Sequence, residues 1–297
     1  MNAVAALPVH PGAELLLDVP AADYHRRELG VASASTLKLI RDRSPAHYRA
    51  WIDATDDHET PALLFGRAYH MRVLEPERFA ATYVAPPENP PRRPTEAQRN
   101  AKKPSDDTIA AIAFWDAWNA ENAGKETLTR DDFERIEAMH AALMQHPLAA
   151  GIMRAGHSEV TMRWIDEQSG VQCKARADWW VPGKFFMDLK TTEDASPRAF
   201  VRSIEKYGYH AQHALYCEAA RACGETIRNY LILAQEKEPP YAAAVYHIDA
   251  AAEIRGFELI QESLQVMRRC LEEDRWPAYG DGIQELSLPP WALRSEA

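Results

Sequence analysis

Cysteine is scarce in this 297-residue chain, and its few cysteines are widely spaced. They are Cys173, Cys217, Cys223 and Cys270. No two of them form a CxxC pair, so the spacing of a zinc ribbon is absent. A four-cysteine iron–sulfur cluster would need all four to converge from distant positions. We therefore expect reduced thiols that are mostly buried.

Long apolar runs are also missing. No run reaches the length of about 18 residues that a membrane-spanning helix requires. The first residues, MNAVAALPVHPGAELLLDVP, lack the basic segment that opens a secretory signal. These absences predict a cytoplasmic protein with no membrane partner.

An excess of positive charge is the third feature that the chain lacks. It has 34 Lys and Arg against 44 Asp and Glu, for a net charge of −10, which excludes a histone-like protein held to DNA by bulk charge. A local basic groove remains compatible with this balance. The 46% hydrophobic and 26% charged residues are ordinary for a globular chain and exclude extensive disorder. A chain of this length buries roughly three quarters of its unfolded surface, and we expect one domain over residues 1–297.

The first half of the chain carries helix signals. Ser or Thr followed by Pro is typical of a helix start, since proline is favoured at the first helical position. The pattern predicts helices over residues 44–51 and 60–74. Two more helices are expected over residues 107–119 and 129–145, the second opened by Thr129 and Asp132 at the spacing of a capping box.

Residues 86–104 differ in composition from the rest of the first half. They hold six prolines, and five basic residues against two acidic ones. Proline this dense opposes both helix and central strand, so we expect an extended loop. The loop is either a solvated linker or a basic arm that contacts phosphates. The five basic residues are Arg92, Arg93, Arg99, Lys102 and Lys103.

The hydrophobic period changes to two in the middle of the chain. Alternation with intervening turns predicts an antiparallel meander of three strands, over residues 159–166, 171–181 and 184–191. Two helices, two strands and a last helix follow, over residues 196 onward, 209–223, 227–235, 241–248 and 249–273. This order predicts an α+β fold with a mixed central sheet flanked by helices. The helical part spans residues 1–155, the sheet core 156–248, and the C-terminal helix and tail 249–297.

Two acidic residues on neighbouring predicted strands suggest the chemistry. Asp188 and Lys190 are two apart on one strand, so their side chains share a face. Asp178 lies on the preceding strand, and the Pro182-Gly183 turn is about midway between the two acids, so they can be cross-strand neighbours. Two such carboxylates repel each other, and a divalent cation such as Mg²⁺ or Mn²⁺ relieves that cost. Lys190 beside the metal can stabilise hydroxide or an attacked phosphate.

Four further residues fit the same site. His70 on a predicted helix can complete a metal shell, and Glu159 at the start of its strand can reach the metal or its waters. Gln212 and Tyr216 are four apart on one helix face, where they can contact phosphate or orient Lys190. Each of the four also has a purely structural interpretation.

A rival metal site lies on the same predicted helix. His210, His213 and Cys217 share a face, as three of four zinc ligands would. No fourth ligand is evident, and the face points away from Gln212 and Tyr216.

The ordered set of these residues resembles a known family. The segments YHRRELGVASASTLKLIRDRSPAHYRAW, LLFGRAYHMRVLEPERF and WPAYGDGIQELSLPPWA resemble RecE-type exonucleases of phages and prophages (exodeoxyribonuclease VIII-like). The middle, with FFMDLKTT and YHAQHALY, resembles the PD-(D/E)xK nuclease core. Ala177 stands where the motif has its proline, and the cysteine spacing of Cas4-type relatives is absent. The resemblance covers residues 24–291.

The resemblance implies a role for each matching residue. His70, Asp178, Asp188 and the Leu189 carbonyl would hold Mg²⁺, and Lys190 would be the catalytic lysine. Glu159 would lie near the metal, with Gln212 and Tyr216 behind it or facing DNA. The family implies 5′→3′ degradation of linear duplex DNA to 3′ single strands, a ring-like homo-oligomer and a RecT-type annealing partner.

Basic residues around the predicted site would contact DNA phosphates. They are Arg67, Arg72, Lys174, Arg176, Arg198, Arg202 and Lys206. A PD-(D/E)xK endonuclease or resolvase is the alternative enzyme. A non-cutting module that binds DNA ends is the alternative without catalysis.

Overall fold

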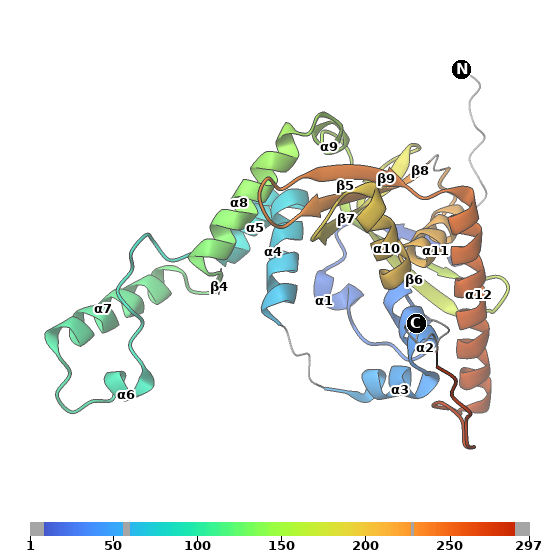
Figure 1. Ribbon diagram of the computed structural model, residues 1–297, viewed down its shortest axis with the longest axis horizontal. Coiled ribbons are helices and arrows are strands. Elements are labelled where there is room, and N and C mark those ends of the chain that lie inside the picture. The colour runs from blue at the N-terminus through green and yellow to red at the C-terminus, as the bar shows by residue number, and fades with distance from the viewer. Residues whose placement is uncertain (1–8, 56–59, 227–228, 289–297) are drawn as a thin grey trace, which may run out of the picture.

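The structure is a computed structural model that describes residues 9–55, 60–226 and 229–288. Its centre is a seven-stranded mixed sheet in the order β1-β5-β6-β7-β8-β9, with β2 paired to β6 (Figure 1). The strands are β1 Glu14–Leu16, β2 Val31–Ala32, β5 His157–Ile165, β6 Gln172–Val181, β7 Phe185–Thr192, β8 Asn229–Glu236 and β9 Ala243–His247. The α+β prediction with a mixed, helix-flanked sheet is confirmed.

Helices cover both faces of this sheet and enclose two apolar clusters. One face packs against α2 Ala34–Asp42, α3 Pro45–Asp53, α10 Pro197–Tyr207, α11 Tyr209–Ala222 and α12 Ala250–Glu273. The other packs against α4 Pro61–Leu74, α5 Pro76–Thr82, α8 Arg130–Gln145 and α9 Pro147–Ile152. The strands therefore bury both of their faces, which explains why several of them have few polar residues.

Strands β5, β6 and β7 form the expected antiparallel meander, and β8 then runs parallel to β7. A parallel neighbour requires a crossover, which α10 and α11 provide. The strand expected from residue 227 begins at Asn229 in the structure, and residues 227 and 228 lie outside the described part of the chain.

The N-terminal part adds elements that the sequence did not predict. β1 extends the sheet beside β5, β2 pairs in parallel with β6, and α1 Ala21–Tyr24 lies between them in the chain. These are segments of two to four residues, so they carry no periodicity to detect. Strands β1 and β2 form because they hydrogen-bond to the long strands β5 and β6.

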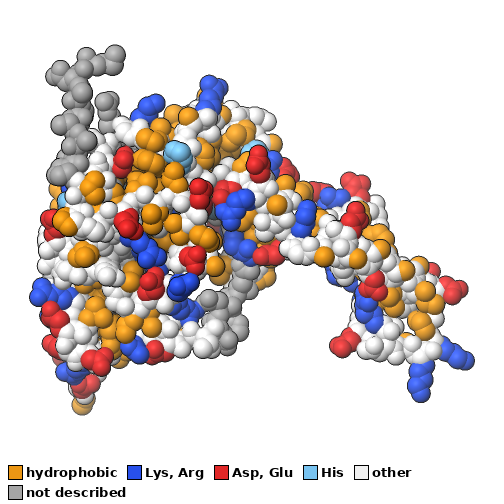
Figure 2. Space-filling model, turned by 180° about the vertical axis from the view of Figure 1, so that it is seen from behind, with side chains coloured by type: hydrophobic (Ala, Val, Ile, Leu, Met, Phe, Trp, Pro, Cys, Tyr) orange, Lys and Arg blue, Asp and Glu red, His pale blue; other side chains and the backbone are white. Residues whose placement is uncertain are grey.

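The proline-rich segment belongs to an arm that projects from the body of the molecule (Figures 1 and 2). The arm contains α6 Glu96–Arg99 and α7 Asp106–Glu121, and its base is a short parallel pair, β3 Tyr83–Val84 with β4 Glu126–Thr127. The expectation of an entirely extended loop is thus wrong over α6. No proline interrupts residues 95–103, and Thr95 and Gln98 form a capping box.

The arm uses two of its basic residues internally. The Arg93 guanidinium lies 3.9 Å from the centre of the Trp115 ring, and Arg99 pairs with Asp116 at 2.9 Å. The Trp115 indole also donates a hydrogen bond to the Pro91 carbonyl at 2.9 Å. These contacts hold the proline-rich segment on α7.

Helices α11 and α12 approach each other closely at one glycine. A Cβ atom on Gly256 of α12 would overlap the His210 carbonyl group of α11, lying 2.7 Å from its carbon atom. Only glycine fits at this crossing without moving a helix. None of the helices in the described ranges is long and apolar enough to cross a membrane.

We predict that Gly256→Ala destabilises the protein by about 1–3 kcal/mol, because the added methyl group forces the two helices apart. Gly151→Ala is the matched control, since Gly151 lies in α9 with no atom within 4 Å of its added Cβ. The control should be as stable as the parent or slightly more stable. Urea unfolding of the three proteins measures both effects, and equal stability of Gly256→Ala would contradict the packing described.

Candidate functional site

A cleft of about 800 Å³ lies where strands β6 and β7 separate. Its lining comes mainly from α1, α2, α4, β6, β7 and α11, with single residues from β2, α3, α5, β5, α10 and α12. Seven of the site residues predicted from the sequence line it: His70, Glu159, Asp178, Asp188, Lys190, Gln212 and Tyr216. The structure therefore brings together residues that are up to 146 positions apart in the sequence.

The separation of β6 and β7 exposes the two acids to each other. The strands pair from Val181 with Phe185 to Trp179 with Met187, and the next pair in this register would be Asp178 with Asp188. There the Asp178 side chain replaces the backbone partner, because its Oδ2 accepts a hydrogen bond from the Leu189 N–H at 2.7 Å. The two carboxylates thus lie on neighbouring strands at the edge of the split.

Lys190 and Gln212 hold the Asp188 carboxylate in place. Lys190 Nζ contacts Asp188 Oδ2, and Gln212 Nε2 donates to the same oxygen at 3.2 Å. Gln212 also contacts the Tyr216 hydroxyl, which donates to the Arg176 carbonyl at 2.8 Å. Helix α11 therefore anchors both the acid and the freed backbone of β6.

Burial sets the protonation of these groups. Asp188 is 2% exposed. The pKa of Asp178 is raised well above its usual range, first by burial and then by the Asp188 charge. Burial by itself lowers the pKa of Lys190, but the charges of Asp188 and Asp178 outweigh it and raise the pKa overall. Lys190 is therefore a cation at neutral pH, which suits charge stabilisation rather than proton abstraction.

His70 faces the acids from helix α4. Its Nδ1 lies 3.7 Å from Asp178 Oδ2, and a hydrogen bond links the ring to the Leu189 backbone. Burial, followed by the Lys190 charge, lowers the pKa of His70 to about 4. The imidazole is therefore neutral at pH 7, which is the form that binds metals.

Glu159 and Tyr24 form the wall beside the acids. Glu159 has a φ of 54° and has no partner in the register of β5 with β6, which passes from Ser158 with Trp179 to Val160 with Ala177. Its carboxylate lies 3.1 Å from Arg176 Nε. Burial raises the pKa of Glu159, although the Arg176 charge opposes the shift. The Tyr24 ring packs 5.0 Å from the Arg176 guanidinium. The sequence offered no signal for Tyr24, which reaches the site from a four-residue helix.

The cleft is more basic than the chain as a whole. Eight of its lining residues are Lys or Arg and five are Asp or Glu, whereas the whole chain has a net charge of −10. Four of the basic residues were not predicted: Arg26, Lys38, Arg41 and Arg78. Arg26 follows α1, whereas the other three lie on α2 and α5, and the fold brings these segments to the cleft. Their positions could therefore not be deduced from neighbouring sequence.

The basic residues that the sequence did predict differ in their surroundings. Lys174 and Arg176 line the cleft but are buried, with Lys174 Nζ bonded to the Arg26 carbonyl at 2.8 Å and to Glu28 at 3.1 Å. Arg67 lines the cleft and forms a two-pronged pair with Glu126 at 3.0 and 2.8 Å. These three cations have partners within the chain.

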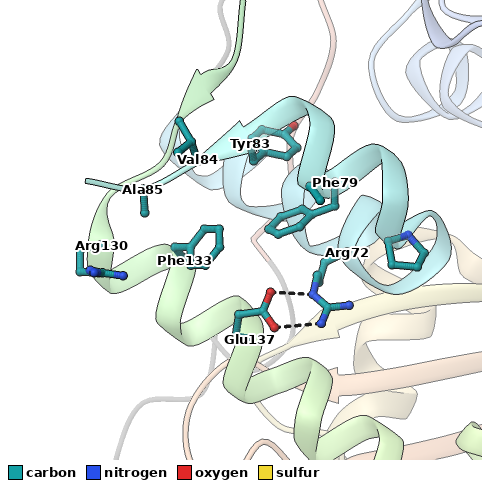
Figure 3. Close-up of a pocket in the computed structure, with 10 residues that line it drawn as sticks. Arg72, Phe79, Tyr83, Val84, Ala85, Arg130, Phe133 and Glu137 are labelled. Atoms are coloured by element: carbon teal, nitrogen blue, oxygen red, sulfur yellow. Dashed lines mark hydrogen bonds and ion pairs between the residues drawn. The ribbon is translucent and has the colours of Figure 1, made fainter. Parts of the chain in front are cut away.

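Arg72 lies outside the cleft, in a second cavity of about 530 Å³ between α4, α5 and α8 (Figure 3). There it forms a two-pronged pair with Glu137 at 2.6 and 2.9 Å, beside Phe79 and Phe133. Residues 70 and 72 are about 200° apart around a helix, so they cannot share a face. The expectation that Arg72 flanks the site with His70 is corrected by this geometry.

Arg198, Arg202 and Lys206 also lie outside the lining of the cleft. They are exposed and spaced by four along α10, so they form one stripe on the surface of that helix. The structure does not bring this stripe together with the acids.

The site suits a hard divalent cation. Asp178, Asp188, the Leu189 carbonyl and His70 offer three oxygen donors and one nitrogen, and Mg²⁺ binds through one or two carboxylates while keeping several waters. Burial and then the Asp188 charge raise the pKa of Asp178, and a bound cation would oppose both effects. The donor types of these residues fit the cation that the sequence predicted, although the ligand atoms of His70, Asp178 and Asp188 do not all lie within 4.8 Å of one another.

A family model matches residues 33–288, which is most of the chain. It describes a PDDEXK-like domain of unknown function, DUF3799. The chain belongs to this family. The match includes His70, Asp178, Asp188 and Lys190, which we call the acid cluster. No curated protein matches the chain.

Solved structures show the same fold. A protein from Eubacterium rectale described as a "putative exonuclease" aligns with a TM-score of 0.58 at 15% identity, over 93% of this chain and 98% of that one. A phage-related exonuclease from Haemophilus somnus 129PT aligns at 14% identity over 70% of this chain and 95% of that one, with a TM-score of only 0.31. The first similarity establishes the fold of this family member, and the second is too distant to add to it.

We predict that the His70 ring stays neutral as the pH falls from 8 to about 5, since its pKa is lowered to about 4. Folding favours the neutral ring, because the pKa of His70 is lower in the folded protein than in the unfolded chain. The free energy of unfolding therefore decreases as the pH falls from about 6.5 toward 4. NMR of the imidazole ring in metal-free protein measures the titration. A His70 signal that titrates near pH 6.5 would contradict the burial described.

Proposed function

We propose that this PDDEXK-family protein is a Mg²⁺-dependent exodeoxyribonuclease that degrades linear duplex DNA. The observation that carries the proposal is the meeting of Asp178, Asp188 and Lys190 where two strands separate in a basic cleft. A buried acid pair and a paired lysine are a set suited to phosphodiester hydrolysis. Mn²⁺ could replace Mg²⁺, because both prefer oxygen ligands.

Asp178, Asp188, His70 and the Leu189 carbonyl would hold the ion. When bound, Mg²⁺ supplies charge stabilisation to the phosphate and acidifies a bound water. Lys190 carries a positive charge at neutral pH, so it stabilises the attacking water as its proton leaves and the charge on the phosphate. Gln212 fixes the Asp188 carboxylate, and Tyr216 fixes the strand that carries Asp178.

The choice of DNA ends rests on resemblance. The sequence resembles RecE-type exonucleases, and the Eubacterium rectale protein that shares the fold is described as a "putative exonuclease". We propose 5′→3′ degradation that leaves 3′ single strands for recombination, with a ring-like homo-oligomer and a RecT-type annealing protein as the partner. The basic lining of the cleft supports nucleic acid as the substrate, because it offers phosphate contacts in an acidic chain.

We predict that Asp188→Asn abolishes cleavage and that Lys190→Ala reduces it on the order of 10²–10³-fold, since each removes charge from the reacting centre. Lys184→Ala is the matched control, because Lys184 is exposed at the turn of the same β-hairpin. Release of nucleotides from linear duplex DNA with Mg²⁺ measures activity. Full activity of both site variants would refute the proposed catalytic set.

The mode of cleavage is tested with labelled DNA. We expect the protein with Mg²⁺ to shorten linear duplex, to release a 5′ label before a 3′ label, and to spare closed circles. Cutting of circles would replace the exonuclease with an endonuclease or resolvase. Binding of ends without any product would replace it with a non-cutting module.

We also predict that Arg41→Gln weakens DNA binding and lowers the slope of log affinity against log salt by about 1, because Arg41 lines the cleft. Arg198→Gln is the matched comparison, since Arg198 is an exposed cation on α10 outside the cleft lining. Fluorescence anisotropy in Ca²⁺, at several salt concentrations, measures binding without turnover. An equal loss at Arg198 would show that the DNA also follows α10, as the sequence suggested.

A further inference from the structure

A second cluster of metal-ligating side chains lies on the side of α11 that faces α12. It consists of His213 and Cys217 of α11 and Glu253 of α12, and its ligand atoms all lie within 4.8 Å of one another. Figure 1 shows these two helices side by side. In the described part of the chain, this is the one group of three His, Cys, Asp or Glu residues that meets so closely.

The two distances from His213 in this cluster match edges of a metal tetrahedron. His213 Nε2 lies 3.3 Å from Glu253 Oε2 and 3.6 Å from Cys217 Sγ. Typical zinc–ligand bonds at tetrahedral angles place nitrogen about 3.4 Å from oxygen and about 3.5 Å from sulfur. One ring nitrogen thus faces a carboxylate and a sulfur at the spacing that a shared ion would impose.

We propose that His213, Cys217 and Glu253 bind one zinc ion, with water in the fourth position. The donor set of imidazole, thiolate and carboxylate favours zinc over the harder Mg²⁺. Glu253 has a side chain that is 42% exposed, so an ion can enter from solvent, whereas His213 is buried. The site shares no residue with the acid cluster.

The structure changes the ligand set expected from the helix pattern. His210 is not a member, because its Nδ1 lies 3.3 Å from the Ile204 carbonyl. Glu253 takes its place from a helix that starts 33 residues after Cys217. The missing ligand was therefore a residue that only the packing of α12 on α11 supplies.

An ion at this position would be balanced in charge once the Cys217 thiol loses its proton. Burial raises the pKa of Cys217 to about 12, so the metal-free thiol is protonated at neutral pH. Binding of Zn²⁺ would release that proton, and the thiolate and the Glu253 carboxylate would then neutralise the ion. The site thus reaches zero net charge with one proton released for each ion bound.

A zinc ion here would join α11 to α12 near their closest contact. Gly256 of α12 packs against the His210 carbonyl one turn beyond Glu253. Helix α11 carries Gln212 and Tyr216 on its other side, toward the acid cluster. The ion would stabilise the position of the helix that supports the catalytic strand split.

Titration of the full-length protein with Co²⁺ tests the site, because a cobalt–thiolate bond gives a charge-transfer absorption that oxygen ligands do not. We expect this absorption to saturate at one Co²⁺ per chain, to disappear on addition of Zn²⁺, and to be unchanged in Asp188→Asn. It should be lost in Cys217→Ser and in His213→Asn. Cys223→Ser is the matched control and should keep it, since the Cys223 thiol bonds to the Glu14 carbonyl instead.

Stability provides the second readout. Zn²⁺ should raise the melting temperature of the parent and of Asp188→Asn by several degrees, and leave that of Cys217→Ser unchanged. If Cys217→Ser fails to fold, Glu253→Gln keeps the helix packing and should bind zinc at least tenfold more weakly. Absence of the thiolate absorption, its survival in Cys217→Ser, or unchanged affinity in Glu253→Gln would overturn the proposal and leave a metal-free hydrogen-bonded cluster.

Discussion

The site depends on keeping two acidic side chains buried beside each other. Asp178 and Asp188 lie where a hairpin stops pairing, and one lysine two residues further along offsets part of their charge. An isolated buried carboxylate is costly, and a pair of them is worse. The split hairpin, the lysine and the amide of Gln212 together make that arrangement tolerable. The repulsion between the two carboxylates, which Lys190 offsets in part, would also be relieved by a divalent cation.

Helix α11 links the strands that carry Asp178 and Asp188 to the outer layer. One side of it contacts Asp188 and the β6 backbone through Gln212 and Tyr216, and the other side meets α12 through His213 and Cys217. These two pairs alternate along the helix, so a rotation of α11 would disturb both. The close packing at Gly256 restricts such a rotation.

The sequence predicted what short-range rules determine. Capped helices such as α4 and α8 were placed within one or two residues, because a cap and a proline act locally. The meander, and the register that brings Asp178 and Asp188 to corresponding positions just beyond the last β6–β7 pair, followed from the turn between them, since register is set by turn position. The fold class follows from the order of these locally determined helices and strands, and it was confirmed.

The rest depends on contacts between distant segments. Tyr24, Arg26 and the cations of α2 and α5 reach the cleft only through tertiary packing, and Glu253 joins His213 in the same way. The Arg72 prediction failed for a different reason. Helical geometry alone separates residues 70 and 72 onto different faces, so closer attention to periodicity would have kept Arg67 beside His70 and left Arg72 out.

The two-pronged pair between Arg67 and Glu126 connects helix α4 to the base of the arm. Arg67 precedes His70 by one turn of α4, and Glu126 is in the short strand at the base of the projecting arm. The pair therefore ties the base of the arm to the helix that carries His70.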